Sequence, residues 1–369
     1  MDLVVIGAGS AGVRAARLAG SLGKKTVLVE NSNVVGGTCV HKGCVPKKLY
    51  TYASSIHEEL RGAPGFGWNV QNATHGWSIL QRNVQSELTR LDGIYRQILE
   101  KNSVELISGE AAVSGPNQIR VGQQEIRAEN IIIATGGFPW KPNIVGVEHA
   151  SISDDFFMWK QIPKRSVIVG GGYIACELAC VLQNLGSQVS VVIRSKRVLR
   201  SFDFDLRQAV MNNMKALGVN IITSSNVEQI VKTREQTDSF PSLKCHLDSG
   251  AEIDCEAVLF ATGRKPNVPK GTAEVGVKIN EKTGAIVVDE YSRSSIPSIF
   301  ALGDVTNRVN LTPVAIAEAK AVIETLYKRN PTAMRYEFIP SAVCFLGRFL
   351  LRIYRSSHLQ KRLASVLGN

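Results

Sequence analysis

The sequence predicts an α/β fold made of two similar units, and three observations carry this prediction. A strand, a glycine-rich turn, a helix and a second strand follow one another in residues 3–30, and the same order recurs in residues 166–194. Each unit is followed by an apolar run that stops at Ala-Thr-Gly, in residues 131–136 and 258–263. Apolar strands that alternate with helices are typical of parallel sheets covered on both faces. We therefore expect two such sheets.

The first unit carries a glycine pattern typical of dinucleotide binding. The strand Leu3–Ile6 leads into Gly7, Gly9 and Gly12, and the second strand ends in Glu30. The first glycine allows a tight turn, the second lets the backbone approach a pyrophosphate, and the third lets helix and strand pack closely. An acid at the end of the second strand can accept hydrogen bonds from ribose hydroxyls. The unit therefore predicts a Rossmann-like fold that suits the AMP half of a flavin.

The second unit repeats this pattern but ends differently. Residues 170–175 read Gly-Gly-Gly-Tyr-Ile-Ala, and the strand after the helix ends in Arg194. An arginine leaves ribose hydroxyls without an acceptor but suits a 2′-phosphate, and Arg200 lies near enough in sequence to complete a clamp. The unit therefore predicts binding of NADPH rather than NADH. Exposed arginines on a solvated loop are the alternative interpretation.

A third apolar run marks another strand end. Residues 299–302 lead into Gly303 and Asp304, and Leu311-Thr312-Pro313 then opens a helix. Parallel strands of one sheet end at the same edge, where ligands bind. Asp304 is therefore a candidate to bond the ribityl chain of a flavin.

Two cysteines indicate redox chemistry. Cys39 and Cys44 lie five positions apart in the segment Gly36–Lys48. A distorted helix start can bring such cysteines within disulfide reach, and a helix N-terminus with nearby lysines favours the thiolate. A zinc site would need two further ligands, which His41 alone does not supply. Two buried structural cysteines are the remaining alternative.

Composition and charge exclude several classes of protein. The 369 residues are 44% apolar with a net charge of +11, which is typical of a globular chain and excludes disorder. Basic runs interleaved with aromatics are absent, so we expect no nucleic-acid partner. No apolar stretch reaches the roughly 18 residues of a membrane span, and Met1 leads at once into a strand. Seven cysteines, an odd number, suggest free thiols in a reducing compartment, so we expect a cytoplasmic protein. We also expect no bound metal.

Together these motifs resemble the pyridine nucleotide–disulfide oxidoreductases, and within them the glutathione reductases of the plant and bacterial type. The resemblance runs from residue 1 to about residue 343. It rests on Gly36–Lys48, Ile168–Glu177, Ile193–Arg200, Ala261–Pro266, Gly303-Asp304 and Leu311–Ala315. It implies FAD binding by residues 1–137 and 267–337, NADPH binding by residues 138–266, and a stub of a dimerisation domain with a divergent basic tail in residues 338–369.

The resemblance also implies which residues would hold each cofactor. Those that would hold FAD are Gly7, Gly9, Gly12, Glu30, Thr38 and Asp304. Those that would hold NADPH are Gly170, Gly172, Arg194 and Arg200, with Gly263 and Arg264 lining the nicotinamide side. Tyr173 would cover the flavin until the nicotinamide displaces it. The further cofactor-binding positions are Ser10, Lys48, Thr135, Gly136, Ile174, Glu177 and Thr312.

The same resemblance implies an enzyme that reduces glutathione disulfide and so maintains the thiol balance of the cell. Hydride would pass from NADPH to the flavin, which would reduce the Cys39–Cys44 disulfide. Cys44 would stay as the thiolate against the ring, and Cys39 would attack the substrate. Lys47 would pair with Glu177, and this pair would stabilise negative charge on the reduced ring.

Fewer residues bear on the choice of substrate. The resemblance assigns substrate contacts to Ser10, Arg17, Tyr95 and Lys320. Lys320 stands where some relatives carry an arginine, and it cannot replace a bidentate contact. Arg17 argues against trypanothione reductases, and the two NADPH-site arginines argue against dihydrolipoamide dehydrogenases. A mercuric reductase type and a non-catalytic truncated flavoprotein remain as alternatives.

The resemblance stops after Val343. Relatives continue into the interface domain of a homodimer, which donates a catalytic His-Glu pair across the dimer. Without that acid we expect turnover to fall by about 10²–10⁴-fold. Phe345, Phe349 and Ile353 follow a helical spacing among arginines, so the tail is expected to form a basic amphipathic helix. We do not expect this helix to contact a membrane.

Overall fold

Two compact units make up the part of the chain that the computed structural model describes, residues 1–234, 240–345 and 348–354. Unit 1 consists of residues 1–41, 86–138 and 264–336. Unit 2 consists of residues 42–85, 139–263 and the described residues from 337 onward. Each unit contains a parallel sheet with a helix after its first strand, so the expected α/β fold of two similar Rossmann-like units is confirmed.

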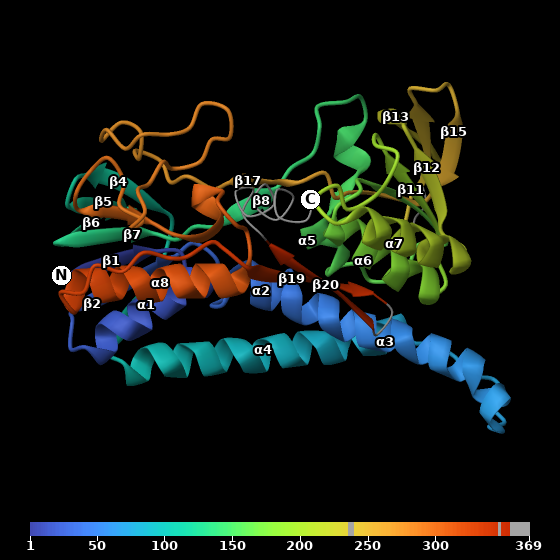
Figure 1. Ribbon diagram of the computed structural model, residues 1–369, viewed down its shortest axis with the longest axis horizontal. Coiled ribbons are helices and arrows are strands. Elements are labelled where there is room, and N and C mark those ends of the chain that lie inside the picture. Colours follow the sequence, from blue (N-terminus) through green and yellow to red (C-terminus); the bar gives the residue numbers. More distant parts are fainter. Residues whose placement is uncertain (235–239, 346–347, 355–369) are drawn as a thin grey trace, which may run out of the picture. The chain divides into compact units, whose positions relative to one another are not determined.

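Unit 1 is built around a five-stranded parallel sheet with the order β18-β7-β1-β2-β3 (Figure 1). Its strands are β1 (Leu3–Ile6), β2 (Thr26–Glu30), β3 (Val104–Ser108), β7 (Asn130–Ile133) and β18 (Ile299–Ala301). On one face, Leu3 and Val5 of β1 share a core with residues of α1 (Ser10–Ser21) and α8 (Thr312–Tyr327). Because successive strand residues point to opposite faces, Val4 and Ile6 belong to the second core.

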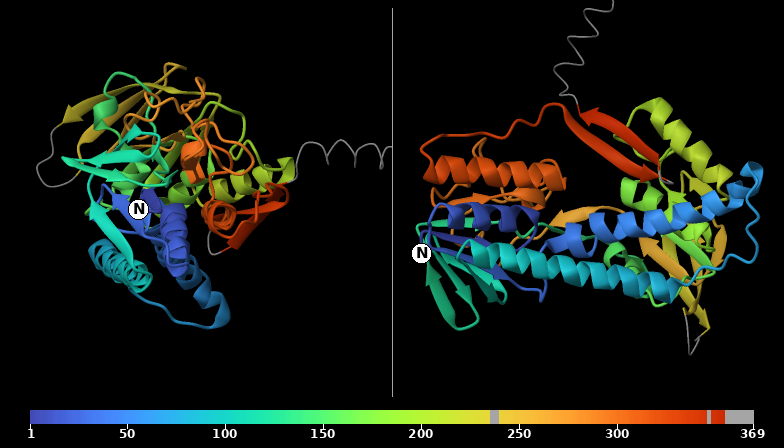
Figure 2. Two further views of the ribbon diagram at one scale, coloured as in Figure 1. Left: turned by 90° about the vertical axis from the view of Figure 1, so that its left-hand side faces the viewer. Right: turned by 90° about the horizontal axis from the view of Figure 1, so that it is seen from below.

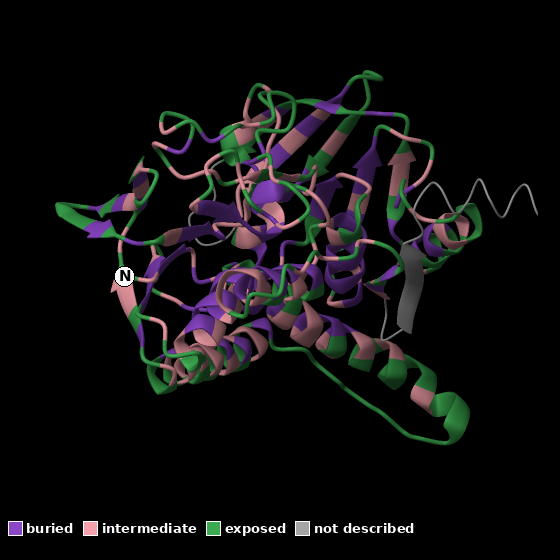
Figure 3. Ribbon diagram, turned by 60° about the vertical axis from the view of Figure 1, so that its left-hand side comes forward, coloured by how far each residue is buried: buried purple, intermediate pink, exposed green. Residues whose placement is uncertain are grey.

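A small antiparallel sheet covers that second face of unit 1. Its strands are β4 (Ala111–Gly115), β5 (Gln118–Val121) and β6 (Gln124–Arg127). Val113, Ile119 and Ile126 of this sheet are buried together with Val4 and Ile6. Both faces of β1 are therefore covered, which explains why all four of its residues are apolar. Figure 3 shows buried residues in purple; β1 is buried along its whole length, and β10 is buried except for Arg165.

Unit 2 repeats this architecture. Its five-stranded parallel sheet has the order β12-β11-β10-β16-β9. The strands are β9 (Ser151–Ile152), β10 (Arg165–Val169), β11 (Gln188–Ile193), β12 (Asn220–Thr223) and β16 (Ala257–Phe260). Helix α6 (Tyr173–Asn184) packs on β10 and β11, and a three-stranded antiparallel sheet shares the core on the other side. That sheet consists of β13 (Val227–Arg234), β14 (Ser242–Leu247) and β15 (Glu252–Cys255).

Shorter elements connect these layers. The remaining helices are α2 (Gly37–His41), α3 (Cys44–Gly62), α4 (Trp77–Lys101), α5 (Ser153–Phe156) and α7 (Phe204–Ala216). The 3-10 turns are η1 (Ala63–Phe66), η2 (Val147–His149) and η3 (Gly303–Thr306), and β8 (Gly137–Pro139) pairs with β17 (Arg264–Pro266). None of the helices in the described residues combines the length and apolar character needed to cross a bilayer.

The units divide the chain differently from the expected FAD- and NADPH-binding segments. Residues 42–85 fall in unit 2, because α3 packs on α6 and Asn184 donates a hydrogen bond to the Ser54 carbonyl at 3.4 Å. An aromatic cluster of Tyr50, Trp77 and Phe156 adds to this packing, with ring centroids 5.0–6.0 Å apart. The assignment of a cofactor to each segment stays a proposal.

The expectation of an amphipathic helix in the tail is wrong. Residues Ile339–Phe345 form β19, and Arg348–Tyr354 form β20, which pairs antiparallel with β19 (Figure 2). The sequence Arg-Phe-Leu-Leu-Arg-Ile-Tyr also fits a strand, since its aromatic and β-branched residues favour extended backbone. A short isolated helix is only marginally stable in water. Pairing with β19 instead provides hydrogen-bond partners for backbone N–H and C=O groups of β20. The basic residues Arg355, Lys361 and Arg362 lie outside the described part of the chain.

Candidate active site

The turn between β1 and α1 suits a phosphate group. Gly7 has a φ of +99°, and a Cβ at Gly12 would lie 1.8 Å from the carbonyl oxygen of Gly7. Neither position can therefore take a side chain without a backbone shift. Gly9 caps α1 without a side-chain hydrogen bond, and no acid occupies the first turn. The first N–H groups of α1 and the positive end of its dipole thus suit a pyrophosphate.

Glu30 lies at the end of β2 and is held against this turn. Its Oε2 accepts the N–H of Ala8 at 2.6 Å, and its Oε1 accepts the N–H of Ser32 at 2.8 Å. Each carboxylate oxygen has a further lone pair. The side chain is therefore fixed next to the glycine turn and can still accept hydrogen bonds from ribose hydroxyls.

Two of the residues expected to hold FAD, Thr38 and Asp304, meet around Arg264 in unit 1. Arg264 Nη2 donates to Thr38 Oγ1 at 3.3 Å and to the Gly137 carbonyl, and its Nε lies 4.0 Å from Asp304 Oδ2. That Nε is buried without a hydrogen-bond partner among the described residues. Burial raises the pKa of Asp304, Arg264 lowers it, and the nearby Glu318 raises it further. Arg264, expected on the nicotinamide side, thus contacts the residues expected to hold FAD.

The remaining FAD candidates also belong to unit 1, except Lys48. Thr135 follows β7 and its Oγ1 donates to the Asn267 carbonyl, while Gly136 has a φ of +67°. Thr312 is the first residue of α8. Thr135 and Gly136 thus follow the end of β7, and Thr312 begins the helix that comes after β18 and η3. Ligands bind beyond such strand ends, as the sequence predicts for a nucleotide site. Lys48 lies in unit 2, 5.1 Å from the ring centroid of Tyr52.

The turn between β10 and α6 has the same construction. Gly170 has a φ of +133°, and a Cβ there would lie 2.4 Å from the Ala261 carbonyl oxygen. Gly172 caps α6 without a side-chain hydrogen bond. Ala175 is fully buried in place of a third glycine, and Tyr173 is 44% exposed at the start of the helix. The turn therefore presents backbone N–H groups and an accessible aromatic ring.

Both arginines predicted to recognise a 2′-phosphate are exposed and follow β11 in unit 2. Arg194 comes directly after β11, and Arg200 lies six residues further along. The N–H of Leu199 donates to the Gly171 carbonyl at 2.6 Å and ties this loop to the glycine turn. Arg197, between them, instead lies over the Phe204 ring and donates to Gln208 at 3.2 Å. Arg194 and Arg200, both exposed, are accessible to a ligand.

Cys39 and Cys44 belong to helices that follow one another in the sequence. Cys39 lies in α2 of unit 1 and is partly exposed, whereas Cys44 is the exposed first residue of α3 in unit 2. Gly43 caps α3 without a side-chain hydrogen bond, so the helix N-terminus favours a thiolate at Cys44. In the described part of the chain, no three His, Cys, Asp or Glu side chains gather as a metal site.

Lys47 and Glu177 form a buried ion pair within unit 2. Their Nζ and Oε1 atoms lie 2.9 Å apart, with side chains 16% and 4% exposed. Burial raises the pKa of the Glu177 carboxyl. Burial tends to lower the pKa of Lys47, but the Glu177 carboxylate outweighs it and the pKa of Lys47 is raised. The sequence paired these residues only through family resemblance, because they lie 130 positions apart.

Sequence reasoning missed a second partner of Glu177. The backbone N–H of Cys344, in β19, donates to Glu177 Oε1 at 2.8 Å, and the Cys344 Sγ lies 4.0 Å from Lys48 Nζ. A backbone donor leaves no trace in residue identity, so no sequence signal could have found it. Glu177 is therefore held by two donors, one from α3 and one from the tail hairpin.

Three of the four substrate candidates cluster in unit 1. Tyr95 is half-buried, and its pKa is raised by burial and by the nearby Cys39, while Arg17 lowers it. Arg17 and Ser10 lie on α1, and the spacing of seven residues places them on one helix face. Lys320 lies exposed on α8. The phenol of Tyr95 thus lies close to Cys39 and to the cationic Arg17.

Comparisons with known proteins agree with these features. A family model described as pyridine nucleotide-disulphide oxidoreductase matches residues 1–319. The glutathione reductase of Burkholderia cepacia is 41% identical over 345 residues, which cover 93% of this chain and 75% of that protein. The chloroplastic/mitochondrial glutathione reductase of Pisum sativum is 42% identical over 353 residues, covering 93% of this chain and 63% of that protein.

A solved structure shares the fold over nearly the whole chain. The HOCl-induced flavoprotein disulfide reductase RclA from Escherichia coli matches with a TM-score of 0.86 and 25% identity. The match covers 98% of this chain and 79% of that one. Both the sequence and the structure of the chain are therefore similar to those of disulfide reductases.

Proposed function

The chain belongs to the pyridine nucleotide-disulphide oxidoreductase family, and we propose that it reduces glutathione disulfide with NADPH through FAD and the Cys39–Cys44 pair. The observation that carries this proposal is the contrast between two similar glycine turns. One turn is held by the carboxylate of Glu30, and the other is tied to a loop that bears Arg194 and Arg200. An acid suits free ribose hydroxyls, whereas arginines suit a 2′-phosphate.

The residues of unit 1 fit FAD. The uncapped start of α1 suits its pyrophosphate, and Glu30 suits its adenosine ribose. The buried Nε of Arg264 lacks a hydrogen-bond partner among the described residues, so it supplies a donor for the polar chain of FAD. The Asp304 carboxylate supplies an acceptor for the same chain. When bound, FAD supplies a group that takes two electrons from NADPH and passes them to a disulfide.

The two cysteines perform thiol–disulfide exchange. The Cys39 thiolate attacks one sulfur of glutathione disulfide, forms a mixed disulfide and releases one glutathione. Cys44 then attacks the Cys39 sulfur, releases the second glutathione and closes the Cys39–Cys44 disulfide. The N-terminus of α3 favours the thiolate of Cys44. The Lys47 ammonium, held by Glu177, stabilises negative charge that develops during the transfer.

Glutathione disulfide as the substrate is supported by two lines. Relatives named glutathione reductase are 36–42% identical over 93% of the chain. In unit 1, Tyr95 lies near both Cys39 and Arg17. A guanidinium can bind a glutathione carboxylate, and a phenol can donate a hydrogen bond. The positive charge of Arg17 would not suit a cationic disulfide.

The proposal is tested with the purified full chain. We expect it to bind FAD, to consume NADPH when glutathione disulfide is added, and to gain two titratable thiols when NADPH is added alone. Lipoamide and a cationic glutathione conjugate serve as competing disulfides. A colourless protein after incubation with FAD, or thiols that do not respond to NADPH, would contradict the proposal.

Coenzyme selectivity should depend on the two exposed arginines. Replacing both, in Arg194→Gln/Arg200→Gln, is expected to lower kcat/KM for NADPH by about 10²-fold or more, because arginine–phosphate contacts are charge-assisted. The value for NADH should change by less than about threefold, since NADH carries no 2′-phosphate. Arg197→Gln is the matched control, because Arg197 packs on Phe204. Equal losses with both coenzymes would contradict the assignment.

We also place the reaction in the cytoplasm, in the homodimer that the family resemblance implies. The odd number of cysteines, seven, supports a reducing compartment. Cell fractionation tests the location, and sedimentation equilibrium of the native protein tests the oligomeric state.

A further inference from the structure

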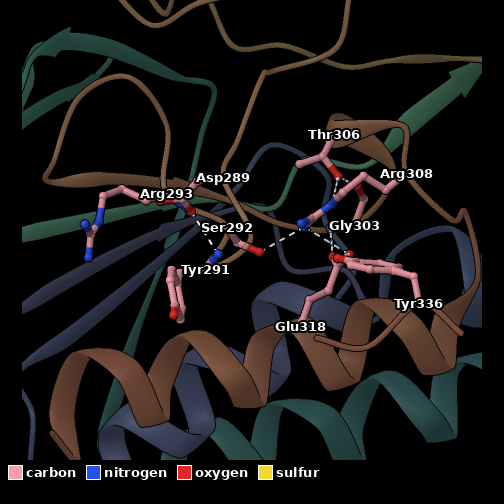
Figure 4. Close-up of polar contacts among 9 residues, drawn as sticks. All are labelled: Asp289, Tyr291, Ser292, Arg293, Gly303, Thr306, Arg308, Glu318 and Tyr336. Atoms are coloured by element: carbon pink, nitrogen blue, oxygen red, sulfur yellow. Dashed lines mark hydrogen bonds and ion pairs between the residues drawn. The ribbon is translucent and has the colours of Figure 1, made fainter. Parts of the chain in front are cut away.

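A buried carboxylate on α8 lies behind the turn that carries Asp304 in unit 1. The Glu318 side chain is only 1% exposed, although its buried neighbours on the helix, Ala315, Ala319 and Val322, are apolar. Its Oε2 accepts the N–H of Gly303 at 2.7 Å (Figure 4). A charged group in such surroundings is stable only with partners, so its contacts define its role.

The other carboxylate oxygen is also paired. Tyr336 donates its hydroxyl to Glu318 Oε1 at 2.6 Å, and Arg308 Nη2 lies 3.0 Å from the same oxygen. Burial and Glu318 both raise the pKa of Tyr336, so its hydroxyl stays protonated and donates. Glu318 therefore accepts from three donors, which come from η3, from the loop after it and from the end of unit 1.

Arg308 extends this network back to the same turn. Its Nε donates to Thr306 Oγ1 at 3.1 Å, and its Nη2 donates to Ser292 Oγ at 2.9 Å. Thr306 Oγ1 in turn donates to the Gly303 carbonyl at 2.8 Å. The N–H of Gly303 is thus fixed by Glu318, and its C=O is fixed by Thr306.

Fixing Gly303 also fixes the residue that follows it. Gly303 has a φ of +70°, a left-handed conformation that the two hydrogen bonds hold in place. Asp304 is the next residue, and its direction depends on the peptide plane between the two. Glu318 accepts the N–H of Gly303, so it can orient Asp304 through this turn.

We propose that Glu318 is a positioning residue for FAD, which holds the Gly303–Thr306 turn so that the carboxylate of Asp304 faces the cofactor. This inference rests on the proposed function, because Asp304 contacts FAD only if the chain binds it. Tyr336 and Arg308 serve the role indirectly, by holding the Glu318 side chain in place.

Charge gives the role a second signature. Among the described residues, the charged groups that face Asp304 are Arg264 on β17 and Glu318 on α8. Arg264 lowers the pKa of Asp304 and Glu318 raises it, in addition to the effect of burial. Removing the charge of Glu318 therefore lowers the pKa of Asp304. FAD affinity, which needs the ionised Asp304, should then persist to lower pH.

The test measures binding of FAD to the apoprotein of the full chain by quenching of flavin fluorescence. Glutamine has a single acceptor oxygen, so Glu318→Gln cannot serve Gly303, Tyr336 and Arg308 together. We expect FAD to bind at least about tenfold more weakly, since a buried donor is left without a partner. The pH below which affinity falls should also decrease. Tyr336→Phe, which leaves the Gly303 bond intact, should change affinity by less than about threefold, because Oε2 keeps its donor.

Matched controls separate the possible outcomes. Glu324→Gln changes a residue on the same helix whose side chain pairs with Lys328 at 3.6 Å, and it should bind FAD as the unaltered chain does. Unchanged affinity in Glu318→Gln, or weaker affinity without the shift in pH, would overturn the inference. If Glu318→Gln does not fold, Thr306→Val decides: it frees the Gly303 carbonyl, and unchanged affinity would overturn the inference. Failure of the unaltered chain to bind FAD would instead refute the proposed function.

Discussion

Replacement of Cys44 by serine is expected to lower NADPH-dependent reduction of glutathione disulfide by at least about 10³-fold, because a hydroxyl cannot replace the thiolate in disulfide exchange. The variant should still bind FAD, since Cys44 lies in unit 2 and the FAD candidates other than Lys48 lie in unit 1. Loss of NADPH absorbance measures turnover, and flavin absorbance measures the bound cofactor.

A control separates the loss of a redox thiol from the loss of any cysteine. Cys245 lies fully buried in β14, away from both glycine turns in sequence. Cys245→Ala should retain turnover within about threefold, because removing one small buried side chain affects packing rather than the redox pair. Retention of more than a tenth of the turnover by Cys44→Ser would show that the electrons leave by another route.

Removal of the Glu177 carboxylate is expected to destabilise unit 2 strongly. Glu177→Ala leaves the Lys47 ammonium buried without its partner and the Cys344 N–H without an acceptor. Breaking one side of a buried ion pair costs about 3–5 kcal/mol of unfolding free energy. Urea unfolding of the full chain, followed by circular dichroism, measures the change. Glu177→Gln should cost less, because its amide oxygen still accepts one hydrogen bond.

Two comparisons test whether burial is the cause. Lys244 and Glu252 lie closer together, with 2.6 Å between Nζ and Oε2, yet both are exposed to solvent on a strand pair. Glu252→Gln should therefore change stability far less, because water screens exposed pairs. The double variant Lys47→Met/Glu177→Gln should recover part of the loss, since no unpaired charge is left buried. A similar cost for Glu177→Ala and Glu252→Gln would contradict the explanation.

Much of the fold could be predicted because its signals are local. Gly7 and Gly12 are required by a turn in which a Cβ at either position would meet backbone atoms, so the residue types themselves report the geometry. The strands were recognisable because both faces of the parallel sheets are covered, which makes strands such as β1 and β16 apolar throughout. Glu30 and Arg194 were recognisable because each ends a strand beside such a turn.

Contacts between distant segments could not be predicted in the same way. Glu177 is bound by the Cys344 amide 167 positions away, and backbone donors are present at nearly every residue. Arg264 contacts Thr38, 226 positions away, because β8 and β17 pair and bring Arg264 to the Gly137 carbonyl, and no sequence motif predicts this contact. The role of Glu318 depends on Arg308 and Tyr336, which no motif marks.

The tail shows how one pattern can support two structures. Phe345, Phe349 and Ile353 match a helical spacing, yet residues 348–354 pair as a strand with β19. For a segment this short, tertiary pairing decides the conformation, because intrinsic preference differs little between the two.

The repeated architecture of the two units has an evolutionary consequence. The residues that distinguish a hydroxyl-binding turn from a phosphate-binding one, Glu30 and Arg194, lie at strand ends outside the buried cores. After duplication of an ancestral module, one copy could exchange its ligand through a few surface changes while its packing stayed intact. Such a history would let two unlike nucleotides share a single polypeptide without the invention of a second scaffold.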